Sequence, residues 1–127
     1  MRILVDGMGG DYSPSEIVKG AVRAASEVDA TIGILGPEET INNLLKQENW
    51  TGNNIEVINA TEVITNDDSP ALAIRRKKDS TIVKGMNMLK AGEADAFISA
   101  GSTGALLSGG LLLLGRIKGI KRPALAA

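Results

Sequence analysis

Two glycine-rich turns are the places where this chain could bind an anion. The first, residues 6–11, reads Asp-Gly-Met-Gly-Gly-Asp and follows a short apolar run. Glycines permit backbone conformations in which consecutive amides point at one anion, so the candidate binding residues here are Asp6, Gly9, Gly10 and Asp11. The spacing is not the G-x-G-x-x-G of a dinucleotide site. A tight turn in which both aspartates bond to the local backbone is an equal alternative.

The second turn, residues 99–105, reads Ser-Ala-Gly-Ser-Thr-Gly-Ala and also follows an apolar run. Small residues leave room for a ligand, and the hydroxyls and the helix N-terminus supply hydrogen-bond donors and a positive dipole end. The candidate catalytic residues are Gly101, Ser102, Thr103 and Gly104. No Gly-Lys-Ser/Thr follows, which excludes a Walker A loop. We favour an oxyanion or phosphate site over a simple helix cap formed by Ser102 or Thr103.

The densest positive charge is the run of Arg75, Arg76, Lys77 and Lys78. Such runs are usually solvated helix faces, but phosphate capture and docking of an acidic protein are alternatives. A looser basic group with the same ambiguity contains Arg116, Lys118, Lys121 and Arg122.

The sequence Asn-Asp-Asp-Ser-Pro at residues 66–70 invites a metal-site interpretation, but it lacks EF-hand spacing. We expect a loop in which Asp68 or Ser69 caps a helix that begins near Pro70. Neither a metal nor another cofactor is expected.

The elements that must position these turns alternate between strand and helix. Apolar runs predict strands at residues 2–5, 31–35, 55–58 and 96–100, and residues 122–127 could open a fifth. Helical periodicity follows each strand, at residues 14–28, 38–47, from 70, at 80–90 and up to 114. Ser13, Pro14 and Glu16 predict a capping box with Ser13 as N-cap. Met86 is expected in the core.

The leucine-rich stretch 106–114 is apolar all round but is shorter than the ~20 residues needed to span a bilayer. We therefore predict a buried helix there. Strands separated by helices predict an α/β fold with a mainly parallel sheet covered on both faces. Residues 1–127 read as one domain, and as an incomplete one.

Composition narrows the chemistry. The chain has 127 residues, of which 43% are hydrophobic and 23% charged, with a net charge of −1. These are ordinary values for a globular protein, and the three aromatic residues argue against a nucleic-acid-binding surface. The absence of cysteine and histidine excludes thiolate chemistry, a Ser-His-Asp triad and the usual zinc sites within these residues.

Five segments together resemble the bacterial phosphate acyltransferases of phospholipid synthesis, in the order and at the intervals typical of that family. They are MRILVDGMGGD at 1–11, EVI at 62–64 with DDSP at 67–70, RRKKD at 75–79, ADAFISAGSTG at 94–104 and GRIKGIKRP at 115–123. Members of that family are more than twice as long, so the resemblance implies the N-terminal portion of a single α/β catalytic domain.

The resemblance implies a three-layer α/β/α sandwich similar to phosphate acetyltransferases and the isocitrate dehydrogenase group. It implies transfer of a fatty acyl group from acyl carrier protein to inorganic phosphate, and the acyl phosphate then feeds a membrane glycerol-3-phosphate acyltransferase. The implied setting is a cytoplasmic homodimer that associates with the membrane surface, with no nucleic-acid partner. A short-chain phosphotransacylase that uses acyl-coenzyme A, and a non-catalytic ligand-binding or dimerisation fragment, are the alternatives.

The resemblance carries over both glycine turns and the basic run. The sequence departs from the family at Tyr12, where histidine is common, and at Ser102, where asparagine is common. The first departure argues against a general base at position 12. Because phosphate is itself the nucleophile, a chain without histidine and cysteine is compatible with the reaction.

Overall fold

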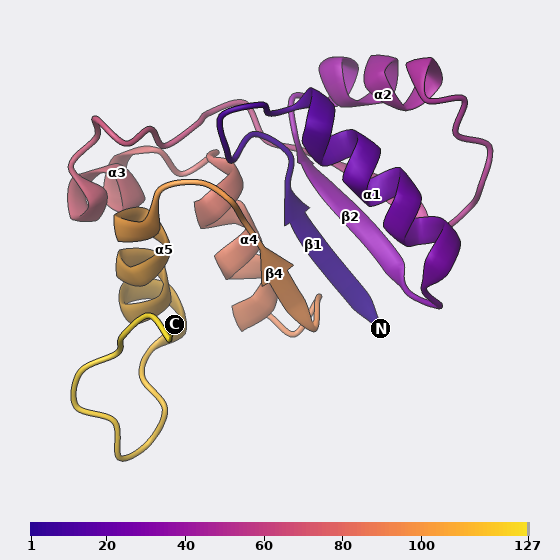
Figure 1. Ribbon diagram of the computed structural model, residues 1–127. Helices are drawn as coiled ribbons and strands as arrows, with labels where there is room; N and C mark the ends of the chain where they lie inside the picture. Colours follow the sequence, from indigo (N-terminus) through magenta and orange to yellow (C-terminus); the bar gives the residue numbers. More distant parts are fainter. Residues whose placement is uncertain (127) are drawn as a thin grey trace.

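The structure is a computed structural model that describes residues 1–126. One four-stranded parallel sheet in the order β3-β2-β1-β4 organises the chain (Figure 1). Its strands are β1 (Arg2–Asp6), β2 (Thr31–Gly36), β3 (Ile55–Asn59) and β4 (Ala96–Ile98). The helices are α1 (Ser15–Glu27), α2 (Glu38–Gln47), α3 (Pro70–Arg76), α4 (Thr81–Lys90) and α5 (Thr103–Gly109), and α5 continues into the π-helical turn η1 (Gly110–Leu114).

The sheet is buried on both faces because alternate side chains of its strands point to opposite sides. Ile32 and Ile34 pack with α1 and α2 on one face. Leu4 and Leu35 pack on the other face, where Phe97 and residues of α4 contribute. The predicted α/β architecture with three layers is therefore confirmed.

A second apolar cluster joins the helices beside β4. Ile74 of α3, Ile82 and Met86 of α4, and Ala105 of α5 are all buried in it. Figure 1 shows α3 and α5 side by side next to α4, away from α1 and α2. This cluster fixes the start of α5 relative to the sheet, and the predicted core position of Met86 is confirmed.

The predicted capping box at the start of α1 is wrong. The N-cap position is Pro14, and no side chain accepts a hydrogen bond from the first helical amides. The hydroxyl of Ser13 instead donates to the carbonyl oxygens of Met8 and Gly10, at 2.9 and 2.8 Å. Ser13 therefore stabilises the first glycine turn, because its hydroxyl bonds to the carbonyl oxygens of that turn and not to the first amides of α1. The apolar face of α1 also ends earlier than predicted, because the helix stops at Glu27 and Val28 is exposed.

The last part of the chain also differs from expectation. β4 ends at Ile98, two residues earlier than predicted, and the side chain of Ser99 then bonds to both glycine turns. Residues 122–126, the part of the anticipated fifth strand that the structure describes, form no strand; residue 127 lies outside the described residues.

The stretch 106–114 is helical but not buried. Leu107, Leu111, Leu112 and Leu114 are exposed, and no residue of η1 is buried. The fully buried residues of α5 are the small Ala105 and Gly109, and Leu106 and Leu113 pack against the same core only in part. None of the helices among residues 1–126 has the length and apolarity to cross a membrane.

Candidate functional site

The two glycine turns lie against each other because they follow neighbouring parallel strands. β1 pairs with β4, so the chain leaves both strands at the same edge of the sheet. A Cβ placed on Gly9 would lie 2.8 Å from the amide nitrogen of Gly101 and 2.7 Å from Oδ2 of Asp6. Any side chain at position 9 would therefore force the turns apart.

A hydrogen-bonded chain through Asp6 and Ser99 holds the two turns in this arrangement. The hydroxyl of Ser99 donates to Oδ2 of Asp6 at 2.8 Å and accepts from the amide of Gly101 at 3.0 Å. The other oxygen of Asp6 accepts from the amide of Met8 at 3.0 Å. Asp6 is 2% exposed, so a buried carboxylate orders both turns.

Ser99 is a site residue that the sequence does not single out. It lies in the second turn, just before the candidate residues 101–104. The available signal was a hydroxyl residue at the end of an apolar run, two positions before a glycine. That pattern is typical of a side chain that bonds to a backbone amide two residues on.

A cavity of about 210 Å³ opens between the two turns and the segment 63–66. From the first turn it is lined by Asp6, Gly9, Gly10 and Asp11, and from the second by Gly101 and Ser102. Six of the twelve residues selected from sequence are thus brought to one place. Val63, Ile64, Thr65 and Asn66 form the remaining wall together with Met8 and Ala100.

The residues at the start of α5 have different roles: Ser102 lines the cavity, and Gly104 packs against α3. The hydroxyl of Ser102 accepts from the amide of Ala105 at 3.3 Å and so caps the helix. Thr103 is exposed at the first helical position. A Cβ on Gly104 would lie 2.9 Å from Cγ of Pro70, which means that this glycine lets α5 approach α3 closely.

The basic run is not one surface. Nζ of Lys77 donates to the carbonyl oxygen of Val63 and to Oδ2 of Asp68, both at 2.8 Å, so it supports the wall of the cavity. The same contact, with the Thr65 amide, holds the pKa of Asp68 below its ordinary value. Arg75 and Lys78 border a different cavity of about 550 Å³ between α3, α4 and η1, and Arg76 is exposed.

Asp68 therefore does not cap α3. Ser69 occupies the N-cap position as expected, but no side chain bonds to the first amides of that helix. Asp68 accepts instead from Thr65 and Lys77, because a cation is a stronger partner than a neutral amide.

A second polar cluster lies beyond the end of β3. Oδ2 of Asp79 accepts from the hydroxyl and the amide of Thr61, and Oδ1 accepts from Nζ of Lys84 at 3.0 Å. The Thr61 hydroxyl, followed by Lys84 and the Thr61 amide, lowers the pKa of Asp79 to about 2. Lys84 also donates to the carbonyl of Asn59, so this cluster connects α4 to β3.

The charge in the cavity between the turns is negative. Among the residues that line it, only Asp6 and Asp11 ionise, and neither lysine nor arginine contributes. Across the described chain, no three carboxylates gather into a group that could hold a metal ion. The donors that this part of the chain can offer a ligand are therefore backbone amides, hydroxyls and the side-chain amide of Asn66.

Comparison with known proteins places the chain in a family. The model of the family described as "Fatty acid synthesis protein" matches residues 1–127. The chain belongs to this family.

Curated relatives agree with that assignment. The chain is 54% identical over 127 residues to a protein named phosphate acyltransferase from Clostridium novyi (strain NT). It is 52% identical over 127 residues to one of the same name from Halothermothrix orenii and 52% identical over 126 residues to one from Alkaliphilus oremlandii. In each case 99% of this chain is covered, but the chain spans only 38% of the relative's length.

Proposed function

We propose that the chain is part of an enzyme that moves a fatty acyl group from acyl carrier protein to inorganic phosphate. The observation that carries the proposal is the meeting of the two glycine turns at one cavity, in a chain whose relatives are named phosphate acyltransferase. The acyl phosphate would serve phospholipid synthesis.

The reaction needs little covalent chemistry from the protein. An oxygen of phosphate attacks the carbonyl carbon of the thioester, the carbon–sulfur bond breaks, and the sulfur leaves with the proton that phosphate gives up. The protein must hold the two reactants together and place donors where the thioester oxygen becomes negative. Backbone amides at a helix start are suited to that task.

We infer that the candidate residues of the two turns take different parts of this task. Gly101 and Gly9 let the turns approach, and Asp6 positions them without contacting a dianion, because two carboxylates beside phosphate would repel it. The Ala105 amide is already bonded to Ser102, so the donors proposed for the oxyanion are the amides of Thr103 and Gly104 and the hydroxyl of Thr103. Ser102 orders that helix start.

Positive charge for phosphate or for the acidic carrier must come from outside the cavity. Arg75, Arg76 and Lys78 are the proposed source on this chain, because all three are exposed and the first two belong to α3, which packs against α5. Lys77 supports the cavity wall. The proposed setting is a cytoplasmic homodimer at the membrane surface, where a membrane glycerol-3-phosphate acyltransferase consumes the product.

The test is formation of acyl phosphate, measured with acyl-acyl carrier protein and with acyl-coenzyme A as donors. It should be run on the 127-residue chain and on the full-length relative from Clostridium novyi carrying the same substitutions. Turnover with the carrier supports the proposal. Turnover with short acyl-coenzyme A alone indicates a phosphotransacylase, and ligand binding without turnover in both proteins indicates a binding or dimerisation module.

A further inference from the structure

The cavity between the two glycine turns is acidic, although the substrate proposed for it is an anion. Among the residues that line it, Asp6 and Asp11 are the only ones that ionise near neutral pH. A carboxylate repels a fully ionised oxyanion at contact distance. Charge attraction from the lining therefore does not explain how inorganic phosphate would be held here.

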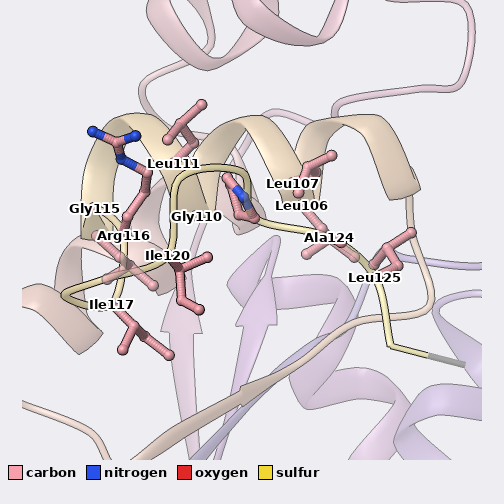
Figure 2. A pocket seen from close by; sticks show the side chains of 12 residues that line it. Leu106, Leu107, Gly110, Leu111, Gly115, Arg116, Ile117, Ile120, Ala124 and Leu125 are labelled. Carbon is pink, nitrogen blue, oxygen red and sulfur yellow. The ribbon is translucent and has the colours of Figure 1, made fainter.

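The basic residues around α3 and α5 do not line this cavity. Nζ of Lys77 is already bonded to Asp68 and to a backbone carbonyl. Arg75 and Lys78 border the cavity between α3, α4 and η1. Arg116 borders an apolar cavity along α5 and η1, which shares no lining residue with the cavity between the turns (Figure 2). Within the part of the chain that the structure describes, recognition at the turns thus depends on hydrogen bonds rather than ion pairs.

The two carboxylates of the cavity differ in what they bond to. The buried carboxylate of Asp6 already accepts hydrogen bonds from both turns. Asp11 is exposed, and its carboxylate takes part in none of the hydrogen bonds or ion pairs among residues 1–126. A Cβ on Gly10 would lie 3.3 Å from Cβ of Ala100, so the residue before Asp11 lies against the second turn. Asp11 therefore offers an unused hydrogen-bond acceptor where the two turns meet.

We propose that Asp11 accepts a hydrogen bond from the P–OH group of inorganic phosphate and so selects protonated oxyanions at this site. The inference rests on the function proposed above and adds the residue that determines which anion is accepted. At neutral pH phosphate keeps at least one proton, whereas sulfate keeps none and has no donor to offer. A hydrogen bond from a hydroxyl to a carboxylate is a strong one. A site that bonds to a hydroxyl rejects the analogue that lacks it.

The remaining oxygens of phosphate need donors, and the cavity has neutral ones. Asn66 contributes a side-chain amide from the wall formed by segment 63–66. The glycine turns contribute backbone amides, which are suited to oxyanions. One carboxylate that accepts, together with neutral groups that donate, matches hydrogen phosphate better than a tetrahedral anion without a proton.

The test compares three tetrahedral anions. Phosphate and arsenate carry a hydroxyl at neutral pH, and sulfate does not. Each is titrated into the 127-residue chain at constant ionic strength, and the amide signals of the two glycine turns are followed by NMR. Phosphate and arsenate should bind with similar affinity, at least about tenfold more tightly than sulfate. Equal affinity for phosphate and sulfate, no phosphate binding, or signal changes confined to residues 75–78 would overturn the proposal.

Asp11→Asn separates the proposed hydrogen bond from general electrostatics. The carboxamide removes the repulsion and can donate to sulfate, so sulfate should bind more tightly and the preference for phosphate should be lost. The matched control is Asp67→Asn, because Asp67 is also exposed and carries the same charge but does not line the cavity. This variant should keep the preference of the parent chain. Equal changes in the two variants would assign the effect to net charge and overturn the role of Asp11.

The full-length relative from Clostridium novyi separates this inference from the proposed function. A phosphate preference that depends on Asp11, without acyl phosphate formation in either protein, leaves the inference standing and removes the function. In an active relative, replacing the residue that matches Asp11 with asparagine should make sulfate a better competitor of phosphate. Acyl phosphate formation in which that substitution changes neither the KM for phosphate nor the inhibition by sulfate retains the function and overturns the inference.

Discussion

The carboxylate of Asp6 and the hydroxyl of Ser99 are joined by a hydrogen bond of 2.8 Å that connects the ends of β1 and β4. Both groups make further hydrogen bonds within the protein: the Asp6 carboxylate also accepts from the amide of Met8, and the Ser99 hydroxyl also accepts from the amide of Gly101. Because it joins residues at the ends of two paired strands, this bond fixes the distance between the two turns once the sheet has formed. It also places the carboxylate of Asp6, which is only 2% exposed, in the wall of the cavity between the turns.

Ser99→Ala should destabilise the chain by about 2 kcal/mol, because Asp6 loses a charge-assisted bond and Gly101 loses an acceptor. Urea denaturation monitored by circular dichroism measures this. Ser26→Ala is the control, since that hydroxyl only donates to the carbonyl of Arg23 on an exposed helix, and it should change stability by less than ~0.5 kcal/mol. Similar losses in the two variants would contradict the role given to Ser99.

Gly9→Ala should cost about 1–3 kcal/mol, because its Cβ would overlap the amide of Gly101 and the carboxylate of Asp6. Gly20→Ala is the matched change on α1. Its Cβ meets nothing within 4 Å, and alanine is the better helix former by about 0.5–1 kcal/mol, so this variant should be stabilised. Thermal denaturation of both variants gives the comparison. A neutral Gly9→Ala would mean that the turns are not in contact.

Gly104→Val should mainly lower stability, whereas Gly101→Val should mainly lower activity. The first should lower the melting temperature, because the added atoms meet Pro70 and separate α5 from α3. In the second, the added Cβ lies 3.1 Å from Oγ of Ser99 and 3.3 Å from Oδ2 of Asp6, so it displaces the groups that hold the two turns together. In the full-length relative it should abolish acyl phosphate formation at saturating phosphate, and circular dichroism should still show a folded protein. Full activity in a folded Gly101→Val variant would reduce that turn to a helix cap.

The Asp79 cluster should make stability depend on pH in the acid range. Its pKa is lowered from 3.8 to about 2 in the folded chain, so the unfolded chain binds the proton more readily. The stabilisation is complete above about pH 4 and is lost as the pH falls toward 2. In urea titrations, the difference in unfolding free energy between the parent and Asp79→Asn should therefore shrink over that interval. A constant difference would contradict the assignment.

Apolar runs and helical periodicity were enough to predict the sheet and most helix limits, because a strand buried on both faces, such as the one containing Ile32, Ile34 and Leu35, is apolar throughout. Because both turns follow strands of a parallel sheet, their position at the same sheet edge was predictable, but the pairing of β1 with β4 that brings them together was not. The roles of single polar side chains were not predictable in the same way. Ser13, Asp68 and Lys77 each had several partners within reach along the sequence, and the choice depended on which carbonyl or carboxylate the tertiary structure brought nearest.

The leucine stretch shows a different limit of sequence reasoning. The burial predicted for it from its apolarity is wrong in this structure, because the core beside α5 and η1 takes up only Ala105, Gly109 and parts of Leu106 and Leu113. Likewise, four consecutive basic residues look equivalent in sequence. The helical turn of α3 nevertheless sends Lys77 toward Val63 while Arg76 remains exposed.

The pairing of β1 with β4 also links ligand binding to folding. Asp6 and Ser99 are separated by 93 positions along the chain, so the site exists only after a long loop has closed. A ligand held between the two turns would bind the native state and not the unfolded chain, and its affinity would appear as added global stability that grows with the logarithm of its concentration. The melting temperature of this chain is therefore a readout of occupancy, even where no turnover can be measured.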